Sequence, residues 1–210
     1  MRKRTIALSV DPRKLMDFIE YLELKLRRGD YSYRYRSGKL YLTLYGSPDE
    51  IEEMERIARR AHRNFMMVHG KSAGGIRRYP REWVIEQCGG VPLSLLVSVL
   101  KSSGHRAELG EKFLVTDIEP GELTELIAGV REILLEVRGE IRQRKVREVI
   151  VTASFITGEP ALLLLMKALE MGLIERVGEV LMFRASPQLV LEKLMGVSSE
   201  DDSKGEEDGT

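Results

Sequence analysis

The chain has 210 residues, of which 43% are hydrophobic and 31% charged, and its 33 basic and 33 acidic residues give a formal net charge of zero. This length and apolar content are enough to bury a core, which excludes a wholly unstructured chain and leaves room for one large domain or two or three small ones. No run approaches the roughly 20 apolar residues of a membrane span. The apolar stretch from Thr5 to Val10 is also too short for the core of a signal peptide.

Rare residue types narrow the class of protein further. Side-chain amides are almost absent, a composition typical of proteins that must survive high temperature, so we expect a thermophilic source. The single cysteine, Cys88, cannot form an internal disulfide, and with three scattered histidines it cannot complete a tetrahedral metal site. We therefore predict no metal and no cofactor, and a cytoplasmic location.

The charges are unevenly distributed along the chain. Residues 1–90 contain 19 basic and 12 acidic residues, a net charge of +7, and residues 91–210 carry the compensating −7. The stretch from Arg56 to Arg81 holds eight Lys or Arg residues and no Asp or Glu, which indicates an anion-binding surface. Residues 197–210 contain six acids and one lysine, and we expect a disordered, solubilising tail; competition with nucleic acid is the alternative.

The first elements in chain order predict a small sandwich. Residues 4–10 alternate like a strand with one buried face, and a helix capped by Asp11 follows. Two alternating runs within residues 31–45 then flank Ser37-Gly38 as a hairpin. A capping box beginning at Ser47 starts the next helix. Residues 1–68 are therefore predicted to form a β-α-β-β-α domain.

The predicted hairpin separates its side chains onto two faces. A two-residue loop pairs Tyr31, Tyr33 and Tyr35 with Leu44, Leu42 and Leu40, and this face is expected to be core. The opposite face places cations between aromatic rings: Arg34, Arg36, Lys39, Tyr41, Thr43 and Tyr45. It is either an ordinary solvated sheet face or a surface that contacts nucleic acid.

The second predicted helix carries a basic stripe. Its apolar residues recur at about 100° per residue, and the opposite side holds Arg56, Arg59, Arg60 and Arg63. Because the acids of this helix come first and the cations later, complementation of the helix dipole explains the stripe without any ligand. Phosphate binding is the functional alternative.

Residues 69–81 are expected to be a glycine-rich basic linker. They contain Gly-Lys-Ser, but position 65, where a Walker phosphate loop requires glycine, is Phe. Tyr79 either stacks on a base or packs in a core. The cations of the linker are Lys71, Arg77, Arg78 and Arg81.

The second half repeats itself with an offset of 68 residues. Gly90-Val-Pro92 matches Gly158-Glu-Pro160, and several glycines and leucines agree in the same frame. Each unit is predicted to hold a helix after the proline, two short strands and a closing helix, which is the order of a winged helix. The helices in the DNA-reading position are too apolar to read bases, so we expect them to be buried or to pack in a dimer.

The fold class predicted from these elements is α+β, with an N-terminal β-α-β-β-α sandwich followed by two repeated winged-helix-like units. The units are placed at residues 82–145 and 146–196. The segment Val149–Phe155 is ambiguous, because its β-branched residues favour a strand and the repeat offset favours a helix; we favour the helix.

Three features of the chain resemble an uncharacterised archaeal family, domain-of-unknown-function family 2067. They are the leading strand-helix-hairpin-helix, the segment from Gly74 to Trp83 and the motif Cys88-Gly-Gly-Val-Pro92. The resemblance spans about residues 4–195. It implies an archaeal cytosolic protein and brings no known activity, so no functional residue is carried over.

The function expected from these observations is non-catalytic binding of nucleic acid, RNA rather than DNA. One alternative is a protein-interaction or dimerisation module, and another is a winged-helix DNA-binding regulator. Catalysis is not expected, because Cys88 and His69 lack evident partners in the sequence. The predicted binding residues are Arg34, Arg36, Tyr41, Tyr45, Arg56, Arg59, Arg60, Arg63, Lys71, Arg77, Arg78, Tyr79 and Arg81.

Overall fold

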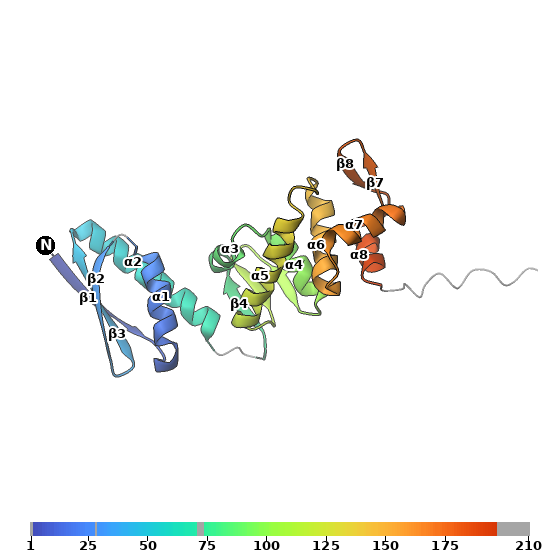
Figure 1. The fold of residues 1–210 in the computed structure, drawn as a ribbon. Helices are drawn as coiled ribbons and strands as arrows, with labels where there is room; N and C mark the ends of the chain where they lie inside the picture. Colours follow the sequence, from blue (N-terminus) through green and yellow to red (C-terminus); the bar gives the residue numbers. More distant parts are fainter. Residues whose placement is uncertain (1, 28, 71–73, 197–210) are drawn as a thin grey trace, which may run out of the picture. The chain divides into compact units, whose positions relative to one another are not determined.

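The chain has an α+β fold, as the sequence predicts, with strands first and helices dominating later (Figure 1). The structure is a computed structural model that describes residues 2–27, 29–70 and 74–196. The chain divides into two compact units, residues 1–74 with 78–80 and residues 75–77 with 81–210. The predicted acidic tail lies outside the described residues.

The N-terminal unit pairs one antiparallel sheet with two helices. Its strand order is β1-β3-β2, so the hairpin strand β3 lies in the centre. The elements are β1 (Arg2–Ser9), the 3-10 helix η1 (Pro12–Lys14), α1 (Leu15–Lys25), β2 (Asp30–Arg36), β3 (Lys39–Gly46) and α2 (Pro48–His69).

The register of the hairpin is the one that the sequence predicts. Tyr33 lies opposite Leu42, and the neighbouring tyrosines of β2 lie opposite the neighbouring leucines of β3. The three leucines are fully buried beneath the helices and share one apolar core with Phe18 of α1 and Phe65 of α2. The tyrosines of the edge strand β2 are only partly covered, because nothing flanks that strand on its outer side.

Both helices of this unit begin where their caps require. The Asp11 carboxylate accepts a hydrogen bond from the Arg13 backbone N–H at 2.9 Å, which starts η1 before α1. The Ser47 hydroxyl and the Glu50 carboxylate complete a capping box with Pro48 as the first residue of α2. The capping box was therefore a reliable signal for the start of the 22-residue helix α2.

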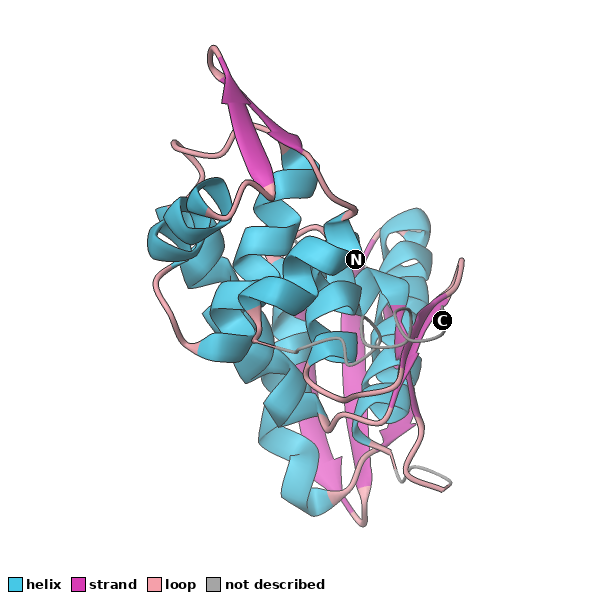
Figure 2. Ribbon diagram, turned by 90° about the vertical axis from the view of Figure 1, so that its right-hand side faces the viewer, coloured by secondary structure: helices cyan, strands magenta, loops and turns pink. Residues whose placement is uncertain are grey.

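The second unit is mainly helical, with two small sheets (Figures 1 and 2). Its strands pair in the orders β4-β6-β5 and β7-β8, although residues 78–80 of β4 are grouped with the first unit. The elements are β4 (Arg77–Pro80), α3 (Arg81–Cys88), α4 (Leu93–Ser102), β5 (Ala107–Leu109), β6 (Phe113–Thr116), α5 (Pro120–Glu136), α6 (Arg144–Thr157), α7 (Ala161–Glu170), β7 (Ile174–Val177), β8 (Val180–Phe183) and α8 (Pro187–Leu194).

The sequence repeat is also a repeat of structure. A shift of 68 residues carries α4 onto α7 at both ends, and it carries the β5–β6 pair onto β7–β8. The ambiguous segment Val149–Phe155 is helical, as favoured, and forms most of α6. The closing helix of the first repeat is α5, which starts at Pro120 and ends at Glu136.

Helix α6 is the element on which both repeats pack. It contacts α4 and α5 on one side and α7 and α8 on the other. Polar bonds fix its contact with α4, because the Ser94 hydroxyl donates to the Glu148 carboxylate at 2.7 Å and the Thr152 hydroxyl donates to Ser98 Oγ at 3.4 Å. The β7–β8 hairpin extends away from these helices in both views (Figures 1 and 2).

Strand β4 is the element that the sequence did not indicate. It occupies Arg77–Pro80, inside the stretch expected to be a linker, and it is hydrogen-bonded to β6. Its Tyr79 side chain is fully buried. Of the two roles weighed for Tyr79, core packing is the one found, and this ring does not stack on a base.

Candidate nucleic-acid interface

The arginine stripe of α2 is partly neutralised by acids of the same helix. Arg56 donates through Nε and Nη2 to the Glu53 carboxylate at 2.6–2.9 Å, and Arg59 Nε donates to Glu55 at 2.8 Å. Arg60 has an interaction partner as well. Arg63 has no ion pair within the described part of the chain. Two of the four arginines of this stripe are therefore engaged in surface ion pairs at i,i+3 and i,i+4 spacing.

Glu55 also ties the helix to the sheet. Its carboxylate accepts from Arg4 Nη1 of β1 at 2.7 Å in addition to Arg59. The hydrogen bond from Arg59, and then the one from Arg4, hold the pKa of Glu55 below its ordinary value. Phosphate would therefore have to compete with this carboxylate for Arg59.

The outer face of the sheet has a different charge balance. We use this name for the side chains that point away from the helices, which are Lys3, Thr5, Ala7 and Ser9 of β1, Asp30, Ser32, Arg34 and Arg36 of β2, and Lys39, Tyr41, Thr43 and Tyr45 of β3. Four of these residues are cations and one is an acid. The four cations form no ion pair with any residue that the structure describes.

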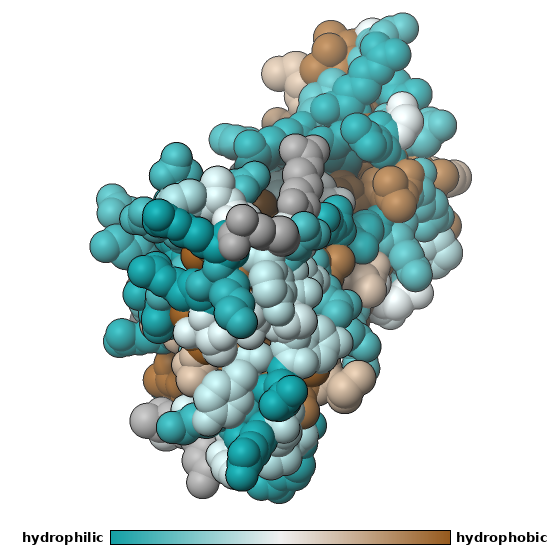
Figure 3. All heavy atoms as spheres, turned by 90° about the vertical axis from the view of Figure 1, so that its left-hand side faces the viewer, coloured by the Kyte–Doolittle hydropathy of each residue, from teal (hydrophilic) through white to brown (hydrophobic). Residues whose placement is uncertain are grey.

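Two tyrosines occupy the centre of the outer face. Tyr41 and Tyr45 both belong to the central strand β3, and the Tyr41 side chain is accessible, with 37% of the residue exposed. Ser32 Oγ and the Tyr45 hydroxyl lie 3.2 Å apart, as do the Thr5 and Thr43 hydroxyls at 3.0 Å, so short polar side chains surround the rings. Figure 3 views the side of the molecule on which this sheet lies in Figure 1, and the surface there consists largely of hydrophilic and intermediate residues.

The structure divides the predicted binding residues among separate places. Arg34, Arg36, Tyr41 and Tyr45 lie together on the outer face, whereas the α2 arginines lie beyond the helix layer that covers the other side of the sheet. The sheet and helix residues cannot contact one short ligand together, because the buried core of the unit separates them.

The remaining predicted residues come from the stretch around β4. Arg77 is mostly buried and forms an ion pair with Glu119, so it is engaged inside its own unit. Arg78 is exposed and Arg81 partly so, and neither side chain forms an ion pair in the described ranges. Lys71 lies outside the described residues.

Lys3 is a member of the outer face that the sequence reasoning missed. The alternation was followed only from residue 4, whereas β1 extends to Arg2 and places Lys3 opposite Tyr45. Continuing the strand period two residues towards the N-terminus would have assigned this lysine to the same face as Thr5.

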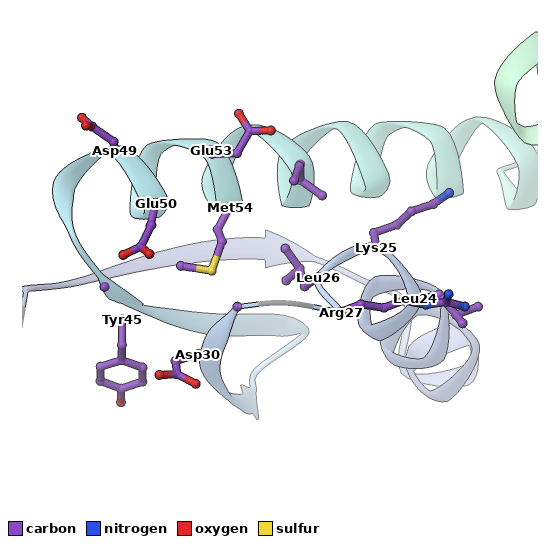
Figure 4. Close-up of a pocket in the computed structure, with 13 residues that line it drawn as sticks. Leu24, Lys25, Leu26, Arg27, Asp30, Tyr45, Asp49, Glu50, Glu53 and Met54 are labelled. Carbon is purple, nitrogen blue, oxygen red and sulfur yellow. The ribbon is translucent and has the colours of Figure 1, made fainter.

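A cavity of about 670 Å³ opens at one end of this unit, between α1, α2 and the end of β3 (Figure 4). Asp49 and Glu53 point away from the sheet, whereas Glu50 and Met54 point beneath α2 (Figure 4). Glu50 accepts from the Ser47 backbone N–H at 2.7 Å, and this bond lowers the pKa of the carboxyl group. Four acidic residues and two basic residues, Lys25 and Arg27, line the cavity, so the net charge of its lining is negative and disfavours phosphate.

Side chains suited to catalysis or metal binding are not grouped in the described ranges. No cluster of three or more His, Cys, Asp or Glu there could hold a metal ion. Cys88 is buried, and burial raises the pKa of its thiol to about 11 although Arg131 opposes the shift. The thiol is therefore protonated at neutral pH, unlike an activated nucleophile.

Comparison with known proteins places the chain in a family without adding a function. A family model described as an uncharacterized protein conserved in archaea (DUF2067) matches residues 11–192. Comparison with curated proteins and with solved structures found no match. Within the described ranges, no single helix has both the length and the apolar composition to cross a membrane. Two helix pairs have that length and composition only when taken together, and both are sharply bent: α3 with α4 by 91° and α6 with α7 by 114°.

Proposed function

The chain belongs to this family of uncharacterised archaeal proteins, DUF2067, and we propose that it is a non-catalytic, cytosolic RNA-binding protein that uses the outer face of its N-terminal sheet. The single observation that carries the proposal is the composition of that face. Two tyrosines on the central strand are flanked by four cations that have no carboxylate partner among the described residues.

The tyrosines supply the contact with bases. Residues two apart on a strand point to the same side and lie about 7 Å apart along it. Tyr41 and Tyr45 are four residues apart, with Thr43 between them, so they span about 14 Å of the central strand. Aromatic rings on an open sheet stack on the unpaired bases of single strands, and each such contact contributes about 1–3 kcal/mol. A flat platform of this kind accepts splayed bases and cannot enter the deep major groove of an RNA duplex.

The cations and hydroxyls supply the contact with the backbone. Arg34 and Arg36 on the edge strand and Lys3 on the opposite strand lie on either side of the tyrosines, where the phosphates of a bound strand would run. Thr43 and Ser32 are neutral donors and acceptors of the kind that contacts a ribose 2′-hydroxyl. This hydroxyl is the group that favours RNA over DNA.

Substitution of the tyrosines tests the proposal directly. In fluorescence anisotropy with a labelled single-stranded RNA at low salt, Tyr41→Leu and Tyr45→Leu should each weaken binding by about 5- to 150-fold, the equivalent of one lost stacking contact. The matched control is Tyr33→Leu, since Tyr33 is also exposed but lies on the inner face of the same sheet. Equal affinities of all three variants and the unmodified chain would reject the sheet face as the binding site.

A second candidate function, self-association, is favoured by the last repeat. The face of α4 that carries Ser94 and Ser98 contacts α6, the first helix of the following repeat, through hydrogen bonds to Glu148 and Thr152. On α7 the equivalent positions are Leu162 and Met166, which are 38% and 57% exposed. The apolar face left open at the end of the array supports binding of a second copy of the chain.

Light scattering distinguishes this candidate. A dimer should be detected at micromolar concentration and should dissociate in Met166→Ser, whereas Met16→Ser, which alters an exposed methionine of α1, should leave it intact. A monomer at every concentration would reject self-association through α7.

A further inference from the structure

A small cavity in the second unit gathers three arginines around a glycine turn. It has a volume of about 210 Å³ and is lined by Gly89 and Gly90, by Arg131 of α5, by Arg138 just after α5 and by Arg147 of α6. The remaining lining residues are Pro92, Leu134 and Leu135, so no carboxylate faces the cavity. Three guanidinium groups therefore share one concave site without an acidic counter-charge in its wall.

These arginines retain unused hydrogen-bond donors. Arg131 Nη2 donates to the Gln87 carbonyl oxygen at 2.5 Å, and Arg147 Nη1 donates to the Ile141 carbonyl oxygen at 3.2 Å. Arg131 Nε is buried and has no hydrogen-bond partner among the described residues. A guanidinium has five N–H donors, and these hydrogen bonds engage one donor each of Arg131 and Arg147, so donors remain for an oxyanion in the cavity.

The glycine turn holds the Arg131 guanidinium in place. A Cβ atom on Gly89 would lie 2.7 Å from Arg131 Nη2 and 2.9 Å from its Cζ, and the residue has φ +51°. Only glycine allows the guanidinium to lie directly against the backbone here. Because the guanidinium also donates to the Gln87 carbonyl oxygen, the Arg131 side chain is held in one position beside the cavity.

The start of α4 adds further positive potential. Its N-cap residue, Pro92, lines the cavity and provides no side-chain hydrogen bond to the first turn. The first backbone N–H groups of a helix point out of its N-terminus and carry partial positive charge, which favours an anion there. This contribution has the same sign as that of the three arginines.

We propose that this cavity binds a phosphate group. Its volume lies below the roughly 300 Å³ at which pockets for whole small molecules begin, so it suits one tetrahedral oxyanion rather than an entire nucleotide. Arginine forks match phosphate oxygens in geometry and charge, and a bound dianion would neutralise the mutual repulsion of the three side chains. The phosphate belongs to a small phosphorylated molecule or to the end of a nucleic acid.

Titration of the full chain with inorganic phosphate, followed by isothermal calorimetry, tests the proposal. Arg138→Gln and Arg147→Gln should each weaken phosphate binding by at least about tenfold, equivalent to about 1.4 kcal/mol. The matched control is Arg106→Gln, because Arg106 is an exposed arginine of the same unit that follows the opposite end of α4. Arg138 is exposed, so its loss leaves the fold intact, which circular dichroism verifies.

Two further probes distinguish the sources of the phosphate. Tighter binding of ribose 5-phosphate than of inorganic phosphate supports a small phosphorylated ligand. A preference for a 5′-phosphorylated over a 5′-hydroxyl oligonucleotide, lost in Arg138→Gln and kept in Tyr41→Leu, supports a nucleic-acid end. The absence of saturable phosphate binding, or an equal loss of affinity in Arg106→Gln, overturns the proposal.

Discussion

The charge balance of the two sides of the N-terminal unit predicts that only one of them contributes to the salt dependence of RNA binding. The perturbation is a pair of double variants with the same change in net charge. Arg34→Gln with Arg36→Gln removes two cations of the outer face, and Arg56→Gln with Arg59→Gln removes two cations of α2. Any effect of net charge alone is therefore the same in both.

The expected magnitudes follow from the partners of each arginine. On single strands, each neutralised phosphate contributes about 0.7 to the slope of log affinity against log salt. Four cations of the outer face thus give a slope of up to about −2.8, and losing Arg34 and Arg36 should reduce it by about 1.4. Arg56 and Arg59 are bound to Glu53 and Glu55, so their loss should leave the slope nearly unchanged.

The assay is fluorescence anisotropy with a labelled oligouridine at several salt concentrations between about 50 and 300 mM. Over this range the Debye length falls from about 14 to about 6 Å, so charges beyond the helix layer are increasingly screened from the outer face. An equal reduction of slope in both double variants would mean that binding follows net charge only. A larger reduction in the α2 variant would move the interface to that helix and refute the reasoning.

Three further predictions concern stability and reactivity. Glu55→Gln should destabilise the N-terminal unit by about 0.5–1 kcal/mol in urea at pH 7, because it breaks two exposed ion pairs. Since the pKa of Glu55 is lowered in the folded state, this contribution to stability is lost as the pH falls below about 4.5. A difference between variant and unmodified chain that is as large at pH 3 as at pH 7 would contradict this. Cys88 should react with a thiol reagent at pH 7 only after denaturation, because its pKa is about 11 and it is buried; rapid labelling of the folded chain would argue against this. Phe18→Ala should cost about 3–5 kcal/mol in urea-induced unfolding, because the ring is fully buried among core residues, and a loss below about 1 kcal/mol would show that the core collapses around it.

Much of the fold is predictable because its signals are local. Capping boxes, the hairpin turn and the strand period depend on neighbouring residues, and they placed α2 and the β2–β3 register correctly. The repeat adds a constraint that local propensity lacks. It identified the helix at Val149–Phe155 although β-branched residues there favour a strand.

The features that sequence reasoning missed depend on distant partners. Strand β4 is four residues long in a stretch rich in arginine, and only its pairing with β6 makes it a strand. Arg77 meets Glu119, which is 42 residues away in the sequence. The three arginines of the phosphate cavity come from α5, from the loop after it and from α6. Arg147 belongs to the basic start of α6, but Arg131 is the one Lys or Arg residue of α5, so no local pattern connects the two.

A net charge of zero therefore says little about anion binding in this chain, because the fold decides which cations are neutralised. On α2 the acids lie one turn before the arginines, and helical spacing alone brings them into contact. On the outer face the strand period sorts cations and tyrosines to one side, and only Asp30 among the acids follows them. In the cavity beside α4 the glycine turn admits Arg131 and excludes any side chain, acidic ones included, at Gly89. The density of cations along the sequence is thus a poor guide to free charge, because Arg56, Arg59 and Arg77 of the densest basic stretch pair with carboxylates within the fold, whereas the cations of the outer face form no ion pair among the described residues.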